Sequence, residues 1–90
     1  MKIFWEGEKK SIISNGLSNP ADITFLSINK WECVFYNIAI PKMTNAHMRA
    51  ELNQDGTWID LHISLTSPQP QKNARSIIEN ILKEIKVNEK

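Results

Sequence analysis

The sequence predicts an α+β fold: an antiparallel β-sheet of four to six strands in a meander, with one C-terminal amphipathic helix packed on one face. Residues 46–65 alternate apolar and polar side chains on either side of the dipeptide Asp55–Gly56, a pattern typical of a β-hairpin. Apolar side chains then recur at steps of three and four residues near the C-terminus, which is typical of a helix with one apolar face.

Length and composition indicate one domain spanning residues 1–90. The chain has 90 residues, of which 41% are hydrophobic and 23% charged, and these values are ordinary for a globular domain. The 11 Lys and Arg residues nearly balance the 10 Asp and Glu residues, which leaves a formal net charge of +1. Because so small a charge does not attract a phosphate backbone, nucleic acid is not a favoured partner.

Cysteine usage and hydropathy favour a soluble, cytoplasmic protein. Cys33 is the only cysteine, so no disulfide can form within the chain and the paired cysteines of zinc sites are missing. Glu6 interrupts the N-terminal apolar residues before they reach the length of a signal peptide, and no apolar run is long enough for a membrane span. Cys33 itself is expected to pack as a small apolar side chain and not to act as a nucleophile.

The N-terminal part is expected to form two short strands and a loop. Residues 2–5 and 11–14 are candidate strands, separated by a turn at Gly7. Residues 15–22, NGLSNPAD, have the composition of a loop.

The next hairpin is indicated by β-branched and aromatic residues. Residues 23–28 and 31–40 flank the dipeptide Asn29–Lys30, which predicts a tight turn, and Pro41 should end the second strand.

The second of these strands is apolar on both faces. One helix can cover only one face, so the other must be closed by residues 6–22 or remain available to another chain. The candidate covering side chains are Ile12, Ile13 and Leu17. The two sets on the strand are Trp31, Cys33 and Phe35 on one face and Val34, Tyr36, Ile38 and Ile40 on the other.

The hairpin of residues 46–65 has one apolar and one polar face, because strand side chains change face at every residue. The apolar set is Ala46, Met48, Ala50, Leu52, Ile59, Leu61, Ile63 and Leu65. The polar set is His47, Arg49, Glu51, Asn53, Trp58, Asp60, His62 and Ser64.

Two loop lengths give different pairings across this hairpin. A two-residue turn at Asp55–Gly56 gives the pairs Arg49–His62, His47–Ser64 and Glu51–Asp60. A four-residue loop over residues 53–56 gives the pairs His47–His62, Arg49–Asp60 and Glu51–Trp58. The second arrangement avoids facing carboxylates, but such an exposed pair costs only about 0.2–1 kcal/mol, so we favour the Asp–Gly turn.

The C-terminal helix is predicted by one apolar stripe. Its members are Ala74, Ile77, Ile78, Ile81, Leu82 and Ile85. Thr66 or Ser67 could cap the start of the helix, and Pro68 or Pro70 could occupy its first turn. Lys83 and Lys86 suit the negative end of the helix.

The polar face of the second hairpin has the residue types of a metal-free ribonuclease site. His47 and His62 could act as general base and acid, and Arg49 could stabilise a developing phosphorane charge, with Glu51 and Asp60 beside them. A solvated strand face must carry polar side chains in any case, and this spacing matches no catalytic motif. We therefore expect no catalytic residue, and histidine pKa values near about 6.5.

Neither a metal nor a cofactor is expected. The two imidazoles lack the further ligands of a zinc motif. The three glycines are isolated from one another, so no glycine-rich phosphate loop exists.

These features favour a non-enzymatic protein-binding domain. Its size, near-neutral charge and mixed acidic and aromatic surface suit an immunity or antitoxin-type inhibitor of a toxin enzyme, with a basic toxin domain as partner. The expected contact residues are Trp58, Asp60, Glu51, Asp55, His62 and Arg49. Two other functions compete: a small ribonuclease or toxin that uses the His/Arg/Glu face of residues 46–65, and a structural homodimer paired through a sheet edge or an apolar face.

Overall fold

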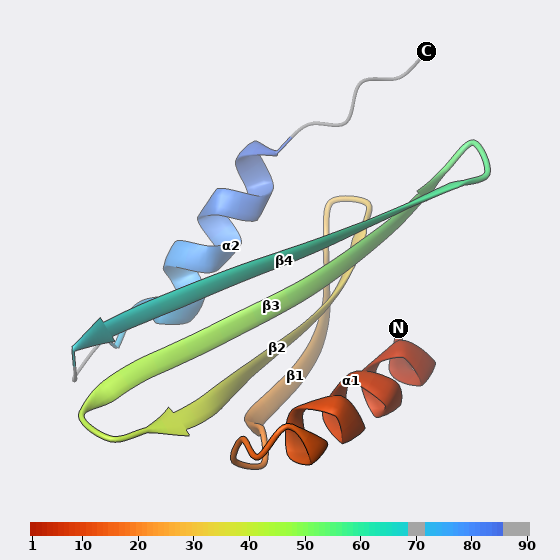
Figure 1. Cartoon of the computed structure of the whole chain (residues 1–90). Coiled ribbons are helices and arrows are strands. Elements are labelled where there is room, and N and C mark those ends of the chain that lie inside the picture. The colour runs from red at the N-terminus through yellow and green to blue at the C-terminus, as the bar shows by residue number, and fades with distance from the viewer. Residues whose placement is uncertain (69–71, 86–90) are drawn as a thin grey trace.

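The computed structural model describes residues 1–68 and 72–85. The elements are α1 (Lys2–Ser14), β1 (Ala21–Ile28), β2 (Trp31–Ile40), β3 (Met43–Gln54), β4 (Thr57–Pro68) and α2 (Ala74–Glu84). The four strands form an antiparallel meander in the order β1-β2-β3-β4. The two helices pack on opposite faces of this sheet, which gives three layers (Figure 1). The predicted sheet and C-terminal helix are therefore confirmed.

The N-terminal segment is a helix, so the prediction of two short strands there is wrong. α1 buries Trp5 and Ile12, which lie seven residues apart and thus on one face of the helix. Gly7 predicted a turn, but it lies inside α1. A glycine within a helix costs about 1 kcal/mol relative to alanine, and packing of the helix on a sheet can offset this cost.

The second apolar face of β2 is closed by α1. Trp5 and Ile12 form a core cluster on this face together with Val34, Tyr36 and Ile38. The expected covering segment, residues 6–22, contributes Ile12, but Trp5 precedes it, and two of the three candidate side chains are not in this cluster. Ile13 and Leu17 remain 45% and 51% exposed.

The β1–β2 hairpin turns at Asn29–Lys30, as predicted. Asn29 has a φ of 54°, a left-handed conformation that asparagine tolerates better than most residues. β2 ends at Ile40, directly before Pro41. The register of β1 shifts between Ala21 and Thr24, so the start of this edge strand is irregular.

The larger core lies between the sheet and α2. It is built from the alternate side chains of β2, β3 and β4 that were predicted to share the apolar face, and α2 contributes Ala74, Ile78 and Leu82. The predicted helical stripe is narrower than expected, because Ile77 and Ile81 remain 37% and 46% exposed on one flank of α2.

The start of α2 differs from the prediction. β4 continues through Thr66, Ser67 and Pro68, so these residues neither cap the helix nor form its first turn. The helix begins at Ala74, and Lys83 lies in its last turn as predicted. Pro70 and Lys86, which also figured in the prediction, lie outside the described residues.

Within residues 1–68 and 72–85, neither helix has the length and hydropathy needed to cross a membrane.

Candidate functional site

The β3–β4 hairpin turns at Asp55–Gly56, where φ is 52° for Asp55 and 81° for Gly56. Positive φ at both central positions is the geometry of a type I′ turn, which the Asp–Gly sequence favours. The pairs across the polar face are Arg49–His62, His47–Ser64 and Glu51–Asp60. The preferred register is confirmed, and the four-residue loop does not form.

α1 lies across part of this polar face. The amino group of Met1 lies 3.0 Å from Oε1 of Glu51, and Oε1 of Glu8 lies 4.0 Å from Nη1 of Arg49. The ring centroid of Phe4 lies 5.1 Å from the guanidinium carbon of Arg49, within cation–π distance. Glu51 and Arg49 were expected to contact a partner, but their side chains are only 15% and 22% exposed and face the chain's own helix.

The two histidines meet although they are not direct partners across the strands. His47 Nδ1 lies 2.9 Å from His62 Nε2, and His47 Nε2 is within hydrogen-bonding distance of Oδ1 of Asn45. The His47 ring stacks on Tyr36, with centroids 5.0 Å apart and an interplanar angle of 7°. Tyr36 contacts Trp5 of α1, with centroids 4.8 Å apart. A row of rings therefore runs from α1 over β2 and β3 to β4.

This environment changes the protonation of the pair. Burial, the nearby His62 and the Arg49 guanidinium lower the pKa of His47 to about 4. Burial and Arg49 also lower the pKa of His62. The prediction of two solvated histidines with pKa values near 6.5 is therefore wrong for His47, which is partly buried. His62 is exposed as predicted, but its pKa is lowered as well. The reason is the position of α1, which the alternation of the hairpin residues does not reveal.

The lowered pKa values limit the chemistry of the histidine pair. A two-histidine ribonuclease mechanism needs one neutral imidazole as the base and one imidazolium as the acid. Near neutral pH this pair supplies a base, but its lowered pKa values disfavour the imidazolium. The histidines border a pocket of about 220 Å³ between α1 and the sheet, smaller than the roughly 300–1,000 Å³ of typical ligand sites.

The end of the β3–β4 hairpin projects beyond β2. Pairing of β2 with β3 stops at Glu32 and Glu51, whereas β3 and β4 stay paired as far as Gln54 and Thr57. About 10 Å of hairpin therefore extends past β2, as Figure 1 shows at the end marked by the turn between β3 and β4. We call residues 53–58 the hairpin tip.

The hairpin tip carries the one tryptophan that the fold does not bury. Trp5 and Trp31 are each 3% exposed, one in each core, whereas Trp58 is 65% exposed. Trp58 pairs with Asn53 across the hairpin, so its ring lies on the polar face. Among the expected contact residues, Trp58 thus offers a large apolar side chain to a partner.

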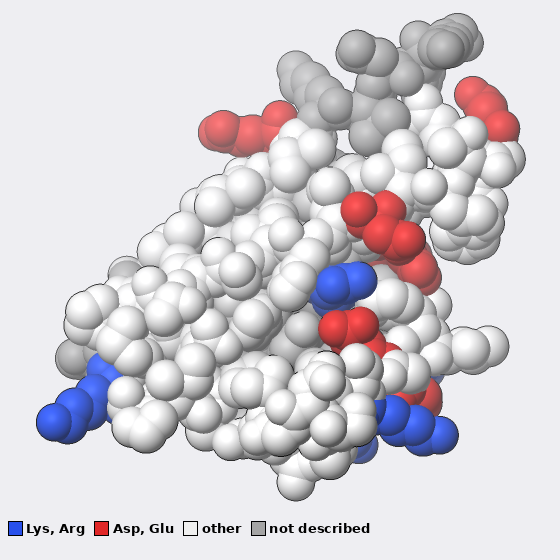
Figure 2. Space-filling model, in the orientation of Figure 1, with Lys and Arg blue, Asp and Glu red and all other residues white. Residues whose placement is uncertain are grey.

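Carboxylates surround the base of the hairpin tip. Glu32, Glu51 and Asp60 are neighbours in a row across β2, β3 and β4, and Asp55 lies in the turn. Asp60 and Asp55 are exposed. Figure 2 shows acidic side chains along the half of the molecule that holds the tip and α1, with Lys and Arg side chains among them near α1 and further acidic side chains over α2. Asp55 and Asp60 therefore remain candidates for contact with a partner, as does the exposed His62.

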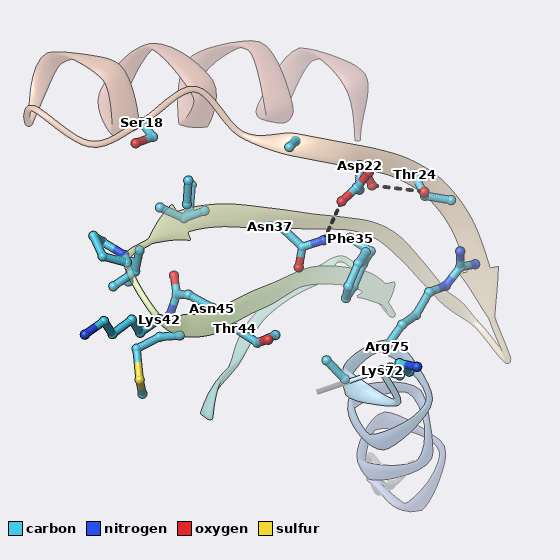
Figure 3. A pocket seen from close by; sticks show the side chains of 17 residues that line it. Ser18, Asp22, Thr24, Phe35, Asn37, Lys42, Thr44, Asn45, Lys72 and Arg75 are labelled. Atoms are coloured by element: carbon cyan, nitrogen blue, oxygen red, sulfur yellow. Dashed lines mark hydrogen bonds between the residues drawn. The ribbon is translucent and has the colours of Figure 1, made fainter. Parts of the chain in front are cut away.

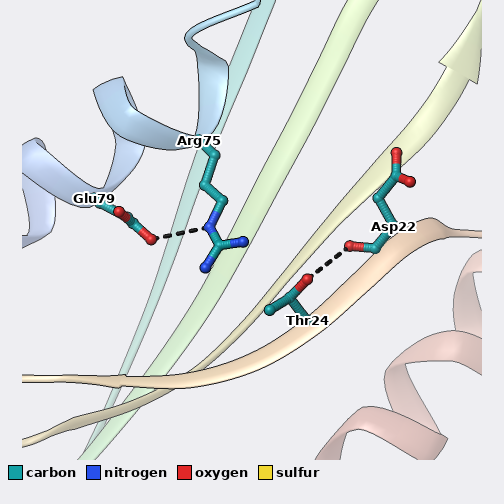
Figure 4. Close-up of polar contacts among 4 residues, drawn as sticks. All are labelled: Asp22, Thr24, Arg75 and Glu79. Carbon is teal, nitrogen blue, oxygen red and sulfur yellow. Dashed lines mark hydrogen bonds and ion pairs between the residues drawn. The ribbon is translucent and has the colours of Figure 1, made fainter.

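A larger groove lies at the opposite end of the sheet, where α2 begins. Its volume is about 990 Å³, and its walls come from β1, β2, β3 and the start of α2 (Figure 3). Asp22 in its wall accepts a hydrogen bond from Nδ2 of Asn37 over 2.8 Å, and its main-chain oxygen accepts one from the Thr24 hydroxyl. Nε of Arg75 donates to Oε1 of Glu79 over 3.0 Å (Figure 4). No sequence pattern indicates this groove, because its lining residues come from separate segments of the chain.

No metal centre is apparent: within residues 1–68 and 72–85, no three His, Cys, Asp or Glu side chains could together hold an ion. Cys33 is 1% exposed, and burial raises the pKa of its thiol to about 11. It packs as an apolar side chain, as predicted.

Comparison with known proteins gives no guide to the activity: no protein-family model, no curated protein and no solved structure matches the chain. The geometry of the molecule alone therefore carries the functional argument.

Proposed function

We propose that the chain is a non-catalytic protein-binding domain of the immunity or antitoxin type, which blocks a basic toxin enzyme through its hairpin tip. The observation that carries the proposal is the 65% exposure of Trp58 on a turn that projects from the sheet. A large exposed aromatic ring gains most when a partner removes it from water, and tryptophan is among the commonest anchors of protein interfaces.

Charge supports a basic partner. Asp55 and Asp60 lie on either side of Trp58 in the sequence, and Glu32 lies in the acidic row at the base of the tip. The whole chain has a net charge of only +1, so attraction of a basic partner would have to come from this local group of carboxylates and not from the charge of the whole chain. Such a patch speeds the approach of a positively charged protein and selects against acidic ones.

The proposal places this binding in the cytoplasm and requires no cofactor. The single thiol of the chain, Cys33, is buried, which suits a reducing compartment but does not by itself define one.

Affinity capture with paired bait proteins tests the proposal. The wild-type chain and Trp58→Ala are used to capture partners from the source cell, and bound proteins are quantified by mass spectrometry. Ile13→Ala is the matched control, because Ile13 is a 45% exposed apolar residue near the end of α1, whereas the start of α1 contacts Glu51 at the base of the tip. We expect one stoichiometric basic protein that binds the wild type and Ile13→Ala but is lost with Trp58→Ala.

Binding measurements with the purified partner then separate the contributions of the Trp58 and Asp60 side chains. Trp58→Ala should weaken binding by at least about 2 kcal/mol. Asp60→Asn should mainly slow association and reduce its dependence on salt. A partner that binds Trp58→Ala as tightly as the wild type would contradict the proposal. So would a loss of binding that parallels a fall in melting temperature, because Trp58 would then act through the fold.

A small metal-free ribonuclease is the second candidate function. The observation that favours it is the 2.9 Å contact between the two histidine rings at the wall of a pocket. Purified protein would have to degrade RNA, and His47→Gln and His62→Gln would each have to abolish that activity. Absence of degradation between about pH 5 and pH 7 would exclude this function.

A further inference from the structure

β4 is an edge strand with one row of unused main-chain groups. It pairs with β3 on one side and has no strand on its other side within the described residues. In a hairpin with a two-residue turn, the residues that close the turn bond to each other and every second residue thereafter points outward. The outward residues of β4 are Trp58, Asp60, His62, Ser64 and Thr66.

From Thr57 to Ser67, the edge of β4 has few of the features that normally prevent strands from pairing with other chains. Such features are bulges, prolines, short length and charged side chains, lysine above all. β1, the other edge, is shorter, follows Pro20 and has a register shift after Ala21. β4 pairs with β3 over 12 residues without a shift, its one proline, Pro68, is its last residue, and its only charged side chain is Asp60. The edge at β1 therefore has features that hinder pairing with another strand, whereas the edge at β4 is open to such pairing.

An exposed apolar flank of α2 lies beside this edge. Arg75 lies 5.9 Å from the ring centroid of Phe35 in β2, and Figure 4 shows Arg75 directed toward the side of the sheet that holds β1. Ile77 and Ile81 occupy the opposite flank of α2, which therefore faces β4, and they are 37% and 46% exposed. The side chains of β4 below this flank are also only partly buried: Ile59, Leu61, Ile63 and Leu65.

We propose that two copies of this chain pair through β4. The two strands run antiparallel about a two-fold axis near His62 and Ile63, so that the two four-stranded sheets join into one continuous sheet. The exposed flanks of the two α2 helices, with Ile77 and Ile81, meet across the same axis. This inference is independent of the function proposed for the hairpin tip.

The sequence of β4 is compatible with a second copy of itself. Antiparallel pairing about this axis aligns outward residues with outward residues, and it keeps the apolar side chains of both strands on the α2 face. Asp60 then lies opposite Ser64 or Thr66 of the second copy, so no like charges meet. A single strand from another protein would pair with the free main-chain groups of β4, but it would leave Ile77 and Ile81 exposed. A second copy of this chain would pair with β4 and also cover Ile77 and Ile81.

The dimer does not require the Trp58 side chain. Trp58 lies four to five residues from the axis, so it sits at the end of the paired edge, where only its main-chain groups take part, and the two Trp58 residues would stand about 30 Å apart. Trp58→Ala should therefore leave the dimer intact even if it abolishes binding to a partner. The two proposals can fail separately.

The test is the mass of the whole chain in solution, measured by light scattering and by sedimentation over about 1–100 µM protein. We expect twice the monomer mass of 10.4 kDa. Ser64→Pro removes an N–H that points to the free edge but spares the bonds to β3. Ile81→Glu places a charge between the two helices. Each variant should raise the dimer dissociation constant by about tenfold or more.

Two matched controls accompany these variants. Ser64→Thr keeps the outward N–H, and Asn80→Glu places the same charge on an exposed part of α2; both should remain dimeric. Circular dichroism checks that each variant is folded, and if Ser64→Pro is not, the comparison of Ile81→Glu with Asn80→Glu decides. A monomeric wild type at about 100 µM would overturn the proposal. A dimer that persists in folded Ser64→Pro and Ile81→Glu would overturn it as well, because another surface would then hold the copies together.

Discussion

Acidification should destabilise the domain through His47. This side chain is neutral in the folded protein, because burial, His62 and Arg49 lower its pKa to about 4. In the unfolded chain its pKa returns to about 6.5. Between these values the unfolded state binds more protons than the folded state. The contribution of His47 to the free energy of unfolding is therefore complete above about pH 6.5 and is lost as the pH falls through about 4.

The size of the effect follows from the pKa shift of His47. One pKa unit corresponds to about 1.4 kcal/mol, so a shift from 6.5 to about 4 sets an upper limit of roughly 3.4 kcal/mol. At about pH 5, linkage gives a loss of about 2 kcal/mol relative to neutral pH. His47 is only partly buried and water screens part of the interaction, so we expect about 1–2 kcal/mol.

Urea unfolding at about pH 7, 6 and 5 measures this loss. Circular dichroism follows the whole fold, and tryptophan emission includes Trp5, whose contact with Tyr36 depends on the docking of α1. His47→Gln is the control, because glutamine does not titrate. It should lose less than about half as much stability as the wild type over this range. The range stays above about pH 5, which is higher than the ordinary pKa of carboxyl groups in an unfolded chain.

Two results would refute the reasoning. Equal losses in the wild type and His47→Gln would show that other groups cause the acid sensitivity. An NMR titration of the folded protein that places the midpoint of His47 above about pH 6 would show that the imidazole is solvated.

The buried faces of α2 and β2 give two further predictions. Ile78→Ala should lower the free energy of unfolding by about 2–5 kcal/mol, because Ile78 is 0% exposed, whereas Ile81→Ala, at 46% exposure, should cost less than about 1 kcal/mol. Urea unfolding of dilute protein compares them, and equal costs would contradict the observed orientation of α2. The Cys33 thiol, 1% exposed with a pKa of about 11, should react with a disulfide reagent only in denaturant; rapid reaction of the native protein would show that it is accessible.

The two hairpins could be predicted because their determinants are local. Side chains alternate along any strand, so the apolar set on β3 and β4 follows from the order of the residues. Asp55–Gly56 favours one turn geometry, and this turn fixes the register of Arg49 opposite His62.

α1 could not be predicted in the same way, because its stability comes from contacts distant in sequence. Only Trp5 and Ile12 are buried in its 13 residues, so its apolar period is weak. The helix is held by packing on Val34, Tyr36 and Ile38 of β2. The lowered histidine pKa values were missed for the same reason, since they depend on where α1 lies.

Because the hairpin tip lies outside both cores, an effect of mutation on binding can be distinguished from an effect on stability. Among the described residues, neither core cluster contains any part of residues 53–58. Replacing Trp58 therefore removes contact surface but no packing, whereas replacing Trp5 or Trp31 would open one of the cores. Binding that is lost with Trp58 while the melting temperature is unchanged would thus have to come from direct contact. The covered residues Arg49 and Glu51 offer no such test, because their side chains also contact α1.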